Sequence, residues 1–90
     1  MTLDQIKFVV EAELQKARMK FPSNKHLLHA FTEEAGEVTK AFLDSNQGKS
    51  GEYDIIKELI QTITMAVRLL QEGDPDFPVL KPIEKFRGGE

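Results

Sequence analysis

Cysteine and tryptophan are absent from this sequence, and tyrosine occurs once. The lack of cysteine excludes disulfide bonds and thiolate metal sites, and this composition fits the cytoplasm. No window approaches the ~18 consecutive apolar residues of a membrane-spanning helix. The N-terminus also lacks the basic start and unbroken apolar stretch of a signal peptide. We therefore expect a cytoplasmic protein with no membrane partner.

The sequence also has no excess of basic over acidic residues. The 90 residues include 12 Lys and Arg against 15 Asp and Glu, which gives a net charge of −3. Such a chain has no general basic field for a nucleic-acid backbone, so we expect no nucleic-acid polymer as a partner. A small anion can still bind through a metal ion. A chain of this length buries only about 60% of its unfolded surface when it folds alone, which favours association with further subunits.

Helical spacing of apolar residues begins at the N-terminus. Thr2 and Gln5 have the form of a capping box, and the apolar residues that follow recur at helical intervals. This pattern predicts a first helix over residues 3–20. No segment alternates polar and apolar residues for long enough to indicate a strand. The fold class is therefore expected to be all-α.

Two polar breaks separate two further helices. Ser23 or Asn24 is expected to cap a second helix over residues 24–45, because either side chain can accept from the first free N–H groups. Ser50 is expected to cap a third helix, which Gly73 ends. The three principal helices would form a bundle that is completed by oligomerisation.

Residues 74–90 contain three of the four prolines and are expected to be largely extended, with one or two helical turns over 82–87. The sequence has no internal repeat and no change in composition along the chain, so residues 1–90 are expected to form a single domain.

The stretch EEAGE at residues 33–37 places acids on the apolar face of the second helix. On a helical wheel Glu34 lies in the middle of the apolar stripe, and Glu37 lies at its border, about 60° away. Glu33 points to the polar side. Because a buried carboxylate costs several kcal/mol unless a cation or hydrogen bonds compensate, Glu34 indicates a functional or paired position.

The third helix repeats this arrangement. Glu58 lies in its apolar stripe, and Gln61 and Asp54 lie on the border beside it. If the two helices pack face to face, Glu34, Glu37 and Glu58 converge with either Gln61 or Asp54. An oxygen-rich site of this kind inside a helix bundle suits Mg²⁺, and Mn²⁺ as an alternative.

Two alternatives remain open for these acids. Acidic pairs on helices are commonly solvated surface residues. Alternatively, Arg18, Lys25 or Arg68 would neutralise the acids in a structural ion-pair cluster.

The pattern EEAGE at residues 33–37, followed by E-x-x-Q at 58–61, resembles the MazG-like all-α nucleoside triphosphate pyrophosphohydrolases. Their pattern is E-E-x-x-E, a variable gap, then E-x-x-D, and the resemblance covers about residues 24–73. It implies a Mg²⁺-dependent enzyme that converts a (d)NTP and water to a (d)NMP and pyrophosphate, as a homodimer or homotetramer.

The resemblance also implies roles for individual residues. Glu34, Glu37 and Glu58 would be metal ligands. Glu33 would support the site or assist the attacking water, and Glu34 would share in catalysis.

The sequence departs from this pattern at Gln61, where the family has Asp. An amide oxygen can coordinate Mg²⁺, but it brings no charge and cannot act as a base. Asp54, about two turns earlier on nearly the same border, is a candidate substitute. Otherwise the protein would be a weakened enzyme, or a nucleotide-binding or helical interaction protein without catalysis.

Cationic and aromatic side chains supply candidates for substrate binding. The cations would contact phosphates and the rings would stack on a base. These candidates are Lys57, Lys81, Lys85, Arg87, Tyr53 and Phe21.

Two other patterns are set aside. GKS at residues 48–50 lacks the preceding glycine and strand of a phosphate-binding loop. His26 and His29 fall on the polar side of the second helix, and no remote fourth ligand for zinc is evident.

Overall fold

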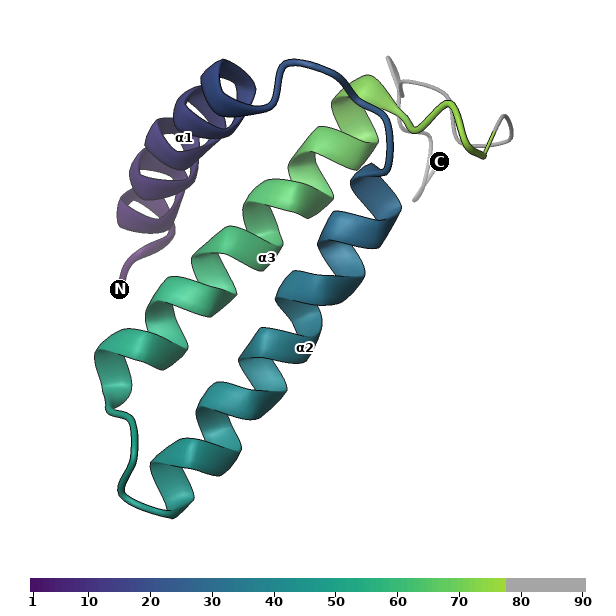
Figure 1. Cartoon of the computed structure of the whole chain (residues 1–90). Helices are drawn as coiled ribbons and strands as arrows, with labels where there is room; N and C mark the ends of the chain where they lie inside the picture. Colours follow the sequence, from purple (N-terminus) through teal and green to yellow (C-terminus); the bar gives the residue numbers. More distant parts are fainter. Residues whose placement is uncertain (78–90) are drawn as a thin grey trace, which may run out of the picture.

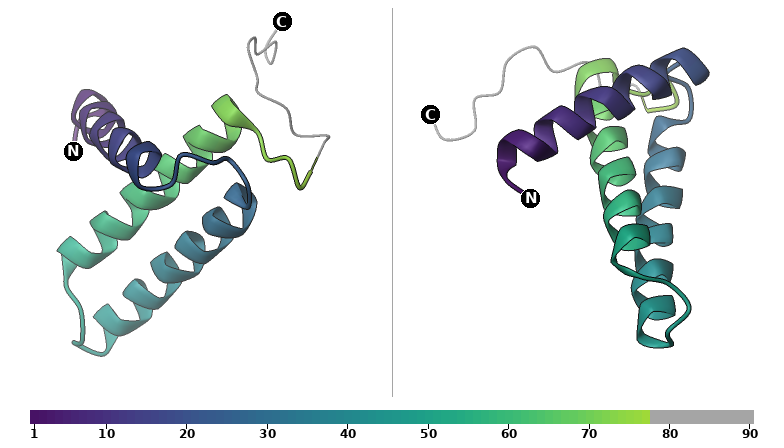
Figure 2. Two further views of the ribbon diagram at one scale, coloured as in Figure 1. Left: turned by 45° about the horizontal axis from the view of Figure 1, so that its top comes forward. Right: turned by 90° about the vertical axis from the view of Figure 1, so that its left-hand side faces the viewer.

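A computed structural model, which describes residues 1–77, contains three helices and no strand within that range. They are α1 (Leu3–Lys20), α2 (Leu27–Asn46) and α3 (Glu52–Glu72). The helices α2 and α3 run antiparallel side by side, and α1 packs on α3 alone (Figure 1). Figure 2 shows that α1 lies across the end of this hairpin instead of parallel to it. The predicted all-α bundle is confirmed.

The N-terminus of α1 has the predicted capping box. The backbone N–H of Gln5 donates to Thr2 Oγ1 at 3.1 Å, and the backbone N–H of Thr2 donates to Gln5 Oε1 at 2.7 Å. Two of the N–H groups that a helix start leaves unpaired are thereby satisfied.

The start of α2 differs from the prediction. The helix begins at Leu27 rather than residue 24, and neither predicted residue caps it. The Ser23 hydroxyl accepts from the Lys25 N–H at 3.1 Å, and the Asn24 side chain donates to the Glu72 carbonyl at 2.9 Å. The Asn24 side chain and the Ser23 carbonyl, which accepts from Arg68 Nη2 at 3.3 Å, hold the connection between α1 and α2 against the end of α3.

The cap of α2 comes from the other end of the chain. Asp74 is 2% exposed, and its carboxylate accepts from the N–H groups of Leu28 and Asp76, both at 2.9 Å. His26 has a left-handed backbone (φ 63°), and its Nδ1 lies 2.6 Å from Asp76 Oδ2. The turn after α3 therefore closes the first turn of α2.

Replacing Asp74 with Ala is expected to lower the melting temperature at pH 7, because the capping N–H groups lose their acceptor. These N–H donors lower the pKa of Asp74. A lowered folded-state pKa means that the stabilisation is present above the unfolded pKa and lost as pH falls through the folded value. Thermal denaturation from pH 7 to pH 3 should show the wild type and variant converging. Asp76→Ala is the control, and an equal loss in both variants would contradict this role.

The start of α3 also differs in its cap. Ser50 was predicted to cap α3, but its hydroxyl donates to the Ala41 carbonyl at 2.9 Å, and Gly51 is the N-cap. The side chain of Asp54 accepts from the Gly51 N–H at 3.3 Å. The helix ends before Gly73 (φ 68°), as predicted.

The turn at residues 74–77 is closed by a bond from the Phe77 N–H to the Asp74 carbonyl at 2.9 Å, so the predicted extended tail does not begin at 74. The remaining tail prediction, including helical turns over 82–87, lies outside the described residues.

The buried apolar set is small for three helices of this length. Its members come from all three helices and are Val10, Leu14, Leu27, Ala41, Ile60 and Leu69. By contrast, Leu59, Ile63 and Leu70 form an exposed apolar line on α3, spaced four and seven residues apart. No helix in the described range is both long and apolar enough to cross a membrane.

Candidate metal and substrate site

The facing surfaces of α2 and α3 bring Glu34 and Glu58 together. The Glu34 atom Oε2 is fully buried and has no hydrogen-bond partner among residues 1–77. Burial, followed by the neighbouring carboxyl group of Glu58 and then by the negative charges of Glu37 and Glu33, raises the pKa of Glu34 to about 7. A carboxyl pair of this kind holds one proton or requires a cation.

A cavity of about 580 Å³ surrounds this pair, and we call it the acid cavity. Its lining includes four of the predicted acids and the predicted amide, Gln61. Asp54 is not among its lining residues. The lining is formed by Thr32, Glu33, Glu34, Gly36, Glu37, Glu58 and Gln61.

As these side chains stand, no three His, Asp or Glu groups of the described residues are close enough to form a ready metal site. Carboxylates without a cation between them repel one another, which favours a spread arrangement. The acid cavity therefore supplies the donor atoms of a metal site without a closed coordination shell.

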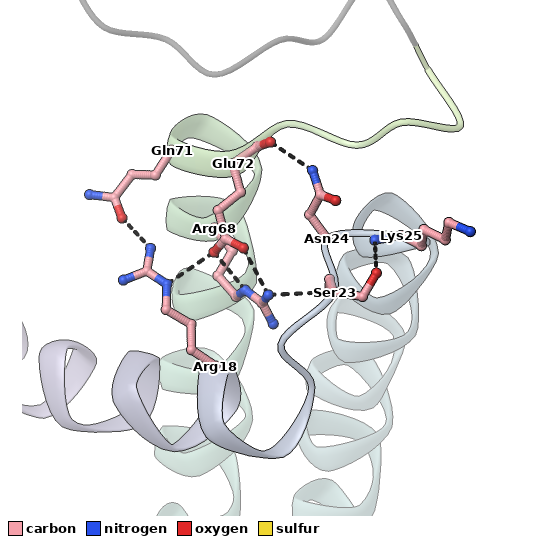
Figure 3. Close-up of polar contacts among 7 residues, drawn as sticks. All are labelled: Arg18, Ser23, Asn24, Lys25, Arg68, Gln71 and Glu72. Atoms are coloured by element: carbon pink, nitrogen blue, oxygen red, sulfur yellow. Dashed lines mark hydrogen bonds and ion pairs between the residues drawn. The ribbon is translucent and has the colours of Figure 1, made fainter.

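The candidate neutralising arginines lie elsewhere. Within residues 1–77, none of Glu34, Glu37 and Glu58 forms an ion pair with Lys, Arg or His. Arg18 and Arg68 instead both pair with Glu72, at the C-terminal end of α3 (Figure 3). Arginine neutralisation of the acids, one of the two alternatives, is therefore not what the described chain shows.

The arrangement around Glu72 is a dense polar cluster. Arg68 is 1% exposed, and its Nε and Nη2 donate to the two Glu72 oxygens at 2.8 and 2.9 Å. Arg18 Nε donates to Glu72 Oε2 at 3.1 Å, and Arg68 Nη2 reaches the Ser23 carbonyl at 3.3 Å. The Arg68 guanidinium, ahead of that of Arg18, lowers the pKa of Glu72. This cluster joins α1, the α1–α2 connection and α3, as Figure 3 shows.

A second cavity, of about 620 Å³, adjoins the acid cavity, and we call it the upper cavity. The two share Glu33, Glu34 and Gln61 in their linings. The upper cavity extends from these residues to the end of the bundle that carries the Glu72 cluster. Its other charged or aromatic lining residues are Glu13, Lys16, Lys20, Phe21, Lys25, His26, His29 and Arg68.

The remaining predicted site residues are dispersed. Phe21 lines the upper cavity. Tyr53, which is 76% exposed, and Lys57 line neither cavity. Glu33 lies at the junction of both cavities, where His29 Nε2 contacts its Oε1 at 3.0 Å. Lys81, Lys85 and Arg87 lie outside the described residues.

Sequence reasoning did not predict that Lys20, Lys25 and Arg68 line a cavity. One signal was present for Arg68, because it follows Gln61 by seven residues and so lies on nearly the same line of α3. Lys20 and Lys25 gave no such signal, because they come from the end of α1 and from the connection after it.

In metal-free buffer, stability is expected to fall as pH rises from about 5 to 8, because Glu34 must ionise in the folded state. Its raised pKa means that the folded state binds the proton more tightly than the unfolded state. Glu34→Gln removes this titration and should stabilise the protein at pH 8 by about 1–2 kcal/mol, after a discount for partial exposure.

Thermal denaturation with a chelator at pH 5 and pH 8 measures this effect. Glu33→Gln, at an exposed carboxylate, is the matched control. Parallel pH profiles for the wild type and Glu34→Gln would contradict the expectation.

Comparisons with models of protein families, with curated proteins and with solved structures find no match to this chain.

Proposed function

We propose that this protein is a Mg²⁺-dependent nucleoside triphosphate pyrophosphohydrolase, which converts a (d)NTP and water to a (d)NMP and pyrophosphate. The observation that carries the proposal is the Glu34–Glu58 contact between α2 and α3, which lacks a cationic side-chain partner among residues 1–77. Unpaired carboxylates that line a cavity are destabilising in the free protein, and a bound divalent cation would remove that cost.

The residues of the acid cavity fit a hard divalent cation. Buried Glu34 Oε2 lacks a partner, and the carboxylates of Glu37 and Glu58 and the amide oxygen of Gln61 supply further oxygen donors. Mg²⁺, or Mn²⁺, would neutralise phosphate charge and acidify a bound water. Gln61 is favoured over Asp54 as the fourth donor, because Asp54 caps the first turn of α3.

Glu33 is the proposed base. It lies where the two cavities meet, and its contact with His29 at 3.0 Å restricts its orientation. The water oxygen would form a bond to the α-phosphorus while the bond to the β-phosphate oxygen breaks. Glu33 would accept the proton of the water, and pyrophosphate would leave with the electron pair of the broken bond.

The nucleoside part of the substrate is proposed to occupy the upper cavity. A volume of about 620 Å³ lies in the range of small-molecule sites. Phe21 borders this space with an exposed ring on which a base can stack. Roles for Lys57, Tyr53 and the tail cations Lys81, Lys85 and Arg87 stay predictions.

We further propose that the chain forms a homodimer or homotetramer through the exposed apolar line of α3. Leu59, Ile63 and Leu70 would otherwise remain in water together. Ile63→Glu should shift sedimentation toward the monomer and make the melting temperature independent of protein concentration. Gln47→Glu, at an exposed position in the α2–α3 connection, is the control. A wild type that is monomeric at all concentrations would contradict the proposal.

A nucleotide-binding protein without hydrolysis is the second candidate. Gln61 lines the acid cavity at the position where the E-x-x-D pattern has an acid, so the site has one negative charge fewer than that pattern provides. A helical interaction protein, whose acids bind neither metal nor nucleotide, is the candidate from a different class.

The test is a panel of ribo- and deoxyribonucleoside triphosphates with Mg²⁺ or Mn²⁺, in which pyrophosphate and nucleoside monophosphate are measured as products. Equal amounts of the two products are expected for at least one nucleotide. Binding without products would leave the nucleotide-binding candidate, and no binding would leave the interaction protein.

A further inference from the structure

The upper cavity has opposite charges at its two ends. Glu33 and Glu34 border one end, and Lys20, Lys25 and Arg68 border the other. Leu27 at the basic end and Glu34 at the acidic end are seven residues apart on α2, and a rise of about 1.5 Å per residue separates their levels by about 10 Å. A ligand that fills the cavity therefore meets acids at one end and cations at the other.

Arg68 is fixed at the basic end. Its Nε and Nη2 are held by Glu72 and by the Ser23 carbonyl, whereas Nη1 has no hydrogen-bond partner within residues 1–77. Glu34 Oε2 is the only fully buried side-chain nitrogen or oxygen atom without a partner in that range, so Nη1 keeps a small accessible surface. Arg68 is one of the residues that line the upper cavity.

The residues that line this end, together with the Glu72 cluster, carry a positive charge overall, while Asp74 and Asp76 beside the start of α2 do not line the cavity. Arg18 and Arg68 share one carboxylate, Glu72, so the cluster keeps one net positive charge. Lys20 and Lys25 add two more, and neither forms an ion pair with a described residue.

Lys20 is placed beside the cavity by its contact with Phe21. Its Nζ lies 5.4 Å from the centre of the Phe21 ring, and both residues line the upper cavity. Lys16 also lines the cavity, but its Nζ lies 3.5 Å from Glu13 Oε1. Of the three lysines that line the upper cavity, the two without a carboxylate partner among the described residues, Lys20 and Lys25, thus lie at the end remote from the acid cavity.

We propose that this basic end binds a second anionic group of the substrate, a phosphate or a carboxylate, about 10 Å from the phosphoanhydride that is hydrolysed. The inference rests on the proposed function, because the first anionic group is the one bound at the acid cavity. A guanidinium held in place and two ammonium groups bind such an oxyanion by charge-assisted hydrogen bonds. The preferred substrate is then a nucleotide with negative charge at both ends.

The test compares four ligands by calorimetric titration in the presence of Mg²⁺. They are ATP, ATP with a 3′-phosphate, ATP with a carboxymethyl group on the N6 amine, and ATP with an ethyl group on that amine. The second anion is expected to tighten binding by about tenfold over its uncharged counterpart, as one or two charge-assisted hydrogen bonds would. The phosphate and carboxylate arms show which group the site accepts.

A double variant, Lys20→Gln with Lys25→Gln, should reduce this tenfold preference to near equality. The matched control is Lys7→Gln with Lys49→Gln, which removes the same charge at two lysines that line neither cavity and should keep the preference. All four substituted residues are exposed, so the variants are expected to fold. Equal binding of all four ligands by the wild type, or an equal loss in both double variants, would overturn the inference.

This test is separate from that of the proposed function, because it measures binding and not product. Tighter binding of the doubly charged nucleotides with no pyrophosphate release would refute the hydrolysis and leave the basic subsite standing. Pyrophosphate release from all four nucleotides, with equal affinities, would support the hydrolysis and refute the basic subsite.

Discussion

Replacing Glu58 with Gln is expected to abolish the rise in melting temperature that Mg²⁺ or Mn²⁺ produces in the wild type. A ligand that binds only the folded state stabilises it by about 2.7 kcal/mol at one hundred times its dissociation constant. Glu58 is the acid that α3 contributes to the acid cavity, opposite Glu34 on α2. Its loss also lowers the charge that attracts the cation, so pyrophosphate release should fall by at least about a hundredfold.

The measurement is thermal denaturation at increasing metal concentration, together with the product assay. Asp54→Asn is the matched control, because it removes a charge from the same helix and Asn retains the capping oxygen. It should leave the metal response unchanged. A loss of the metal response in Asp54→Asn would instead make Asp54 the substitute ligand. A metal response that persists in Glu58→Gln would exclude the site.

Gln61→Asp supplies the opposite change at the same site. It would add a carboxylate to the acid cavity and restore the E-x-x-D pattern. Metal affinity should rise by about tenfold, since a charged oxygen replaces a neutral one. Without metal the same variant should be less stable than the wild type, because a further negative charge joins Glu34 and Glu58.

Arg68→Met is expected to have the largest effect on folding, a loss of about 3 kcal/mol in the free energy of unfolding. Arg68 is almost completely buried, and its removal leaves Glu72 with Arg18 alone and the Ser23 carbonyl without its donor. For a chain of this size the melting temperature should fall by about 12–24 °C.

Urea and thermal denaturation measure this loss. Arg18→Met is the control, because Arg18 contacts the same Glu72 oxygen but has a side chain that is 40% exposed. Its effect should be less than about 1 kcal/mol, as for other exposed ion pairs. Equal effects of the two substitutions would mean that the burial of Arg68 does not govern the strength of the cluster.

The acid dependence of stability should change in the same variant. The lowered pKa of Glu72 means that its contribution is present above the unfolded pKa and lost as pH falls through the folded value. Arg68→Met removes the first cause of that lowering, so its unfolding free energy should depend less on pH in the acid range.

Local patterns predicted the helices because their causes are local. The capping box at Thr2 and Gln5 and the stop at Gly73 depend on neighbouring residues only, and both appear in the structure. The prediction of where α2 begins was wrong for the opposite reason. The carboxylate of Asp74 accepts from the N–H of Leu28, which lies 46 residues earlier in the chain, so no local sequence pattern could predict this cap.

The acid cavity likewise has a part that local patterns predicted and a part that they did not. Helical periodicity placed Glu34 and Glu58 on the inner faces of two helices, and a short connection made those helices antiparallel neighbours. Which border residue joined them was not decided by angle alone, since Gln61 and Asp54 both qualified. In the structure Gln61 lines the acid cavity and Asp54 does not, because Asp54 lies in the first turn of α3 and caps it.

The sequence by itself determined the all-α class, the approximate extent of the helices and the placement of Glu34 and Glu58 on facing sides of α2 and α3, because these follow from a fixed rotation per residue. Only the tertiary structure decided where the arginines go. Arg18, Arg68 and Glu72 meet because α1 crosses the end of the α2–α3 hairpin, and that crossing depends on packing between distant segments. The same crossing leaves the acids without arginine partners and gathers the cations at the far end of the upper cavity.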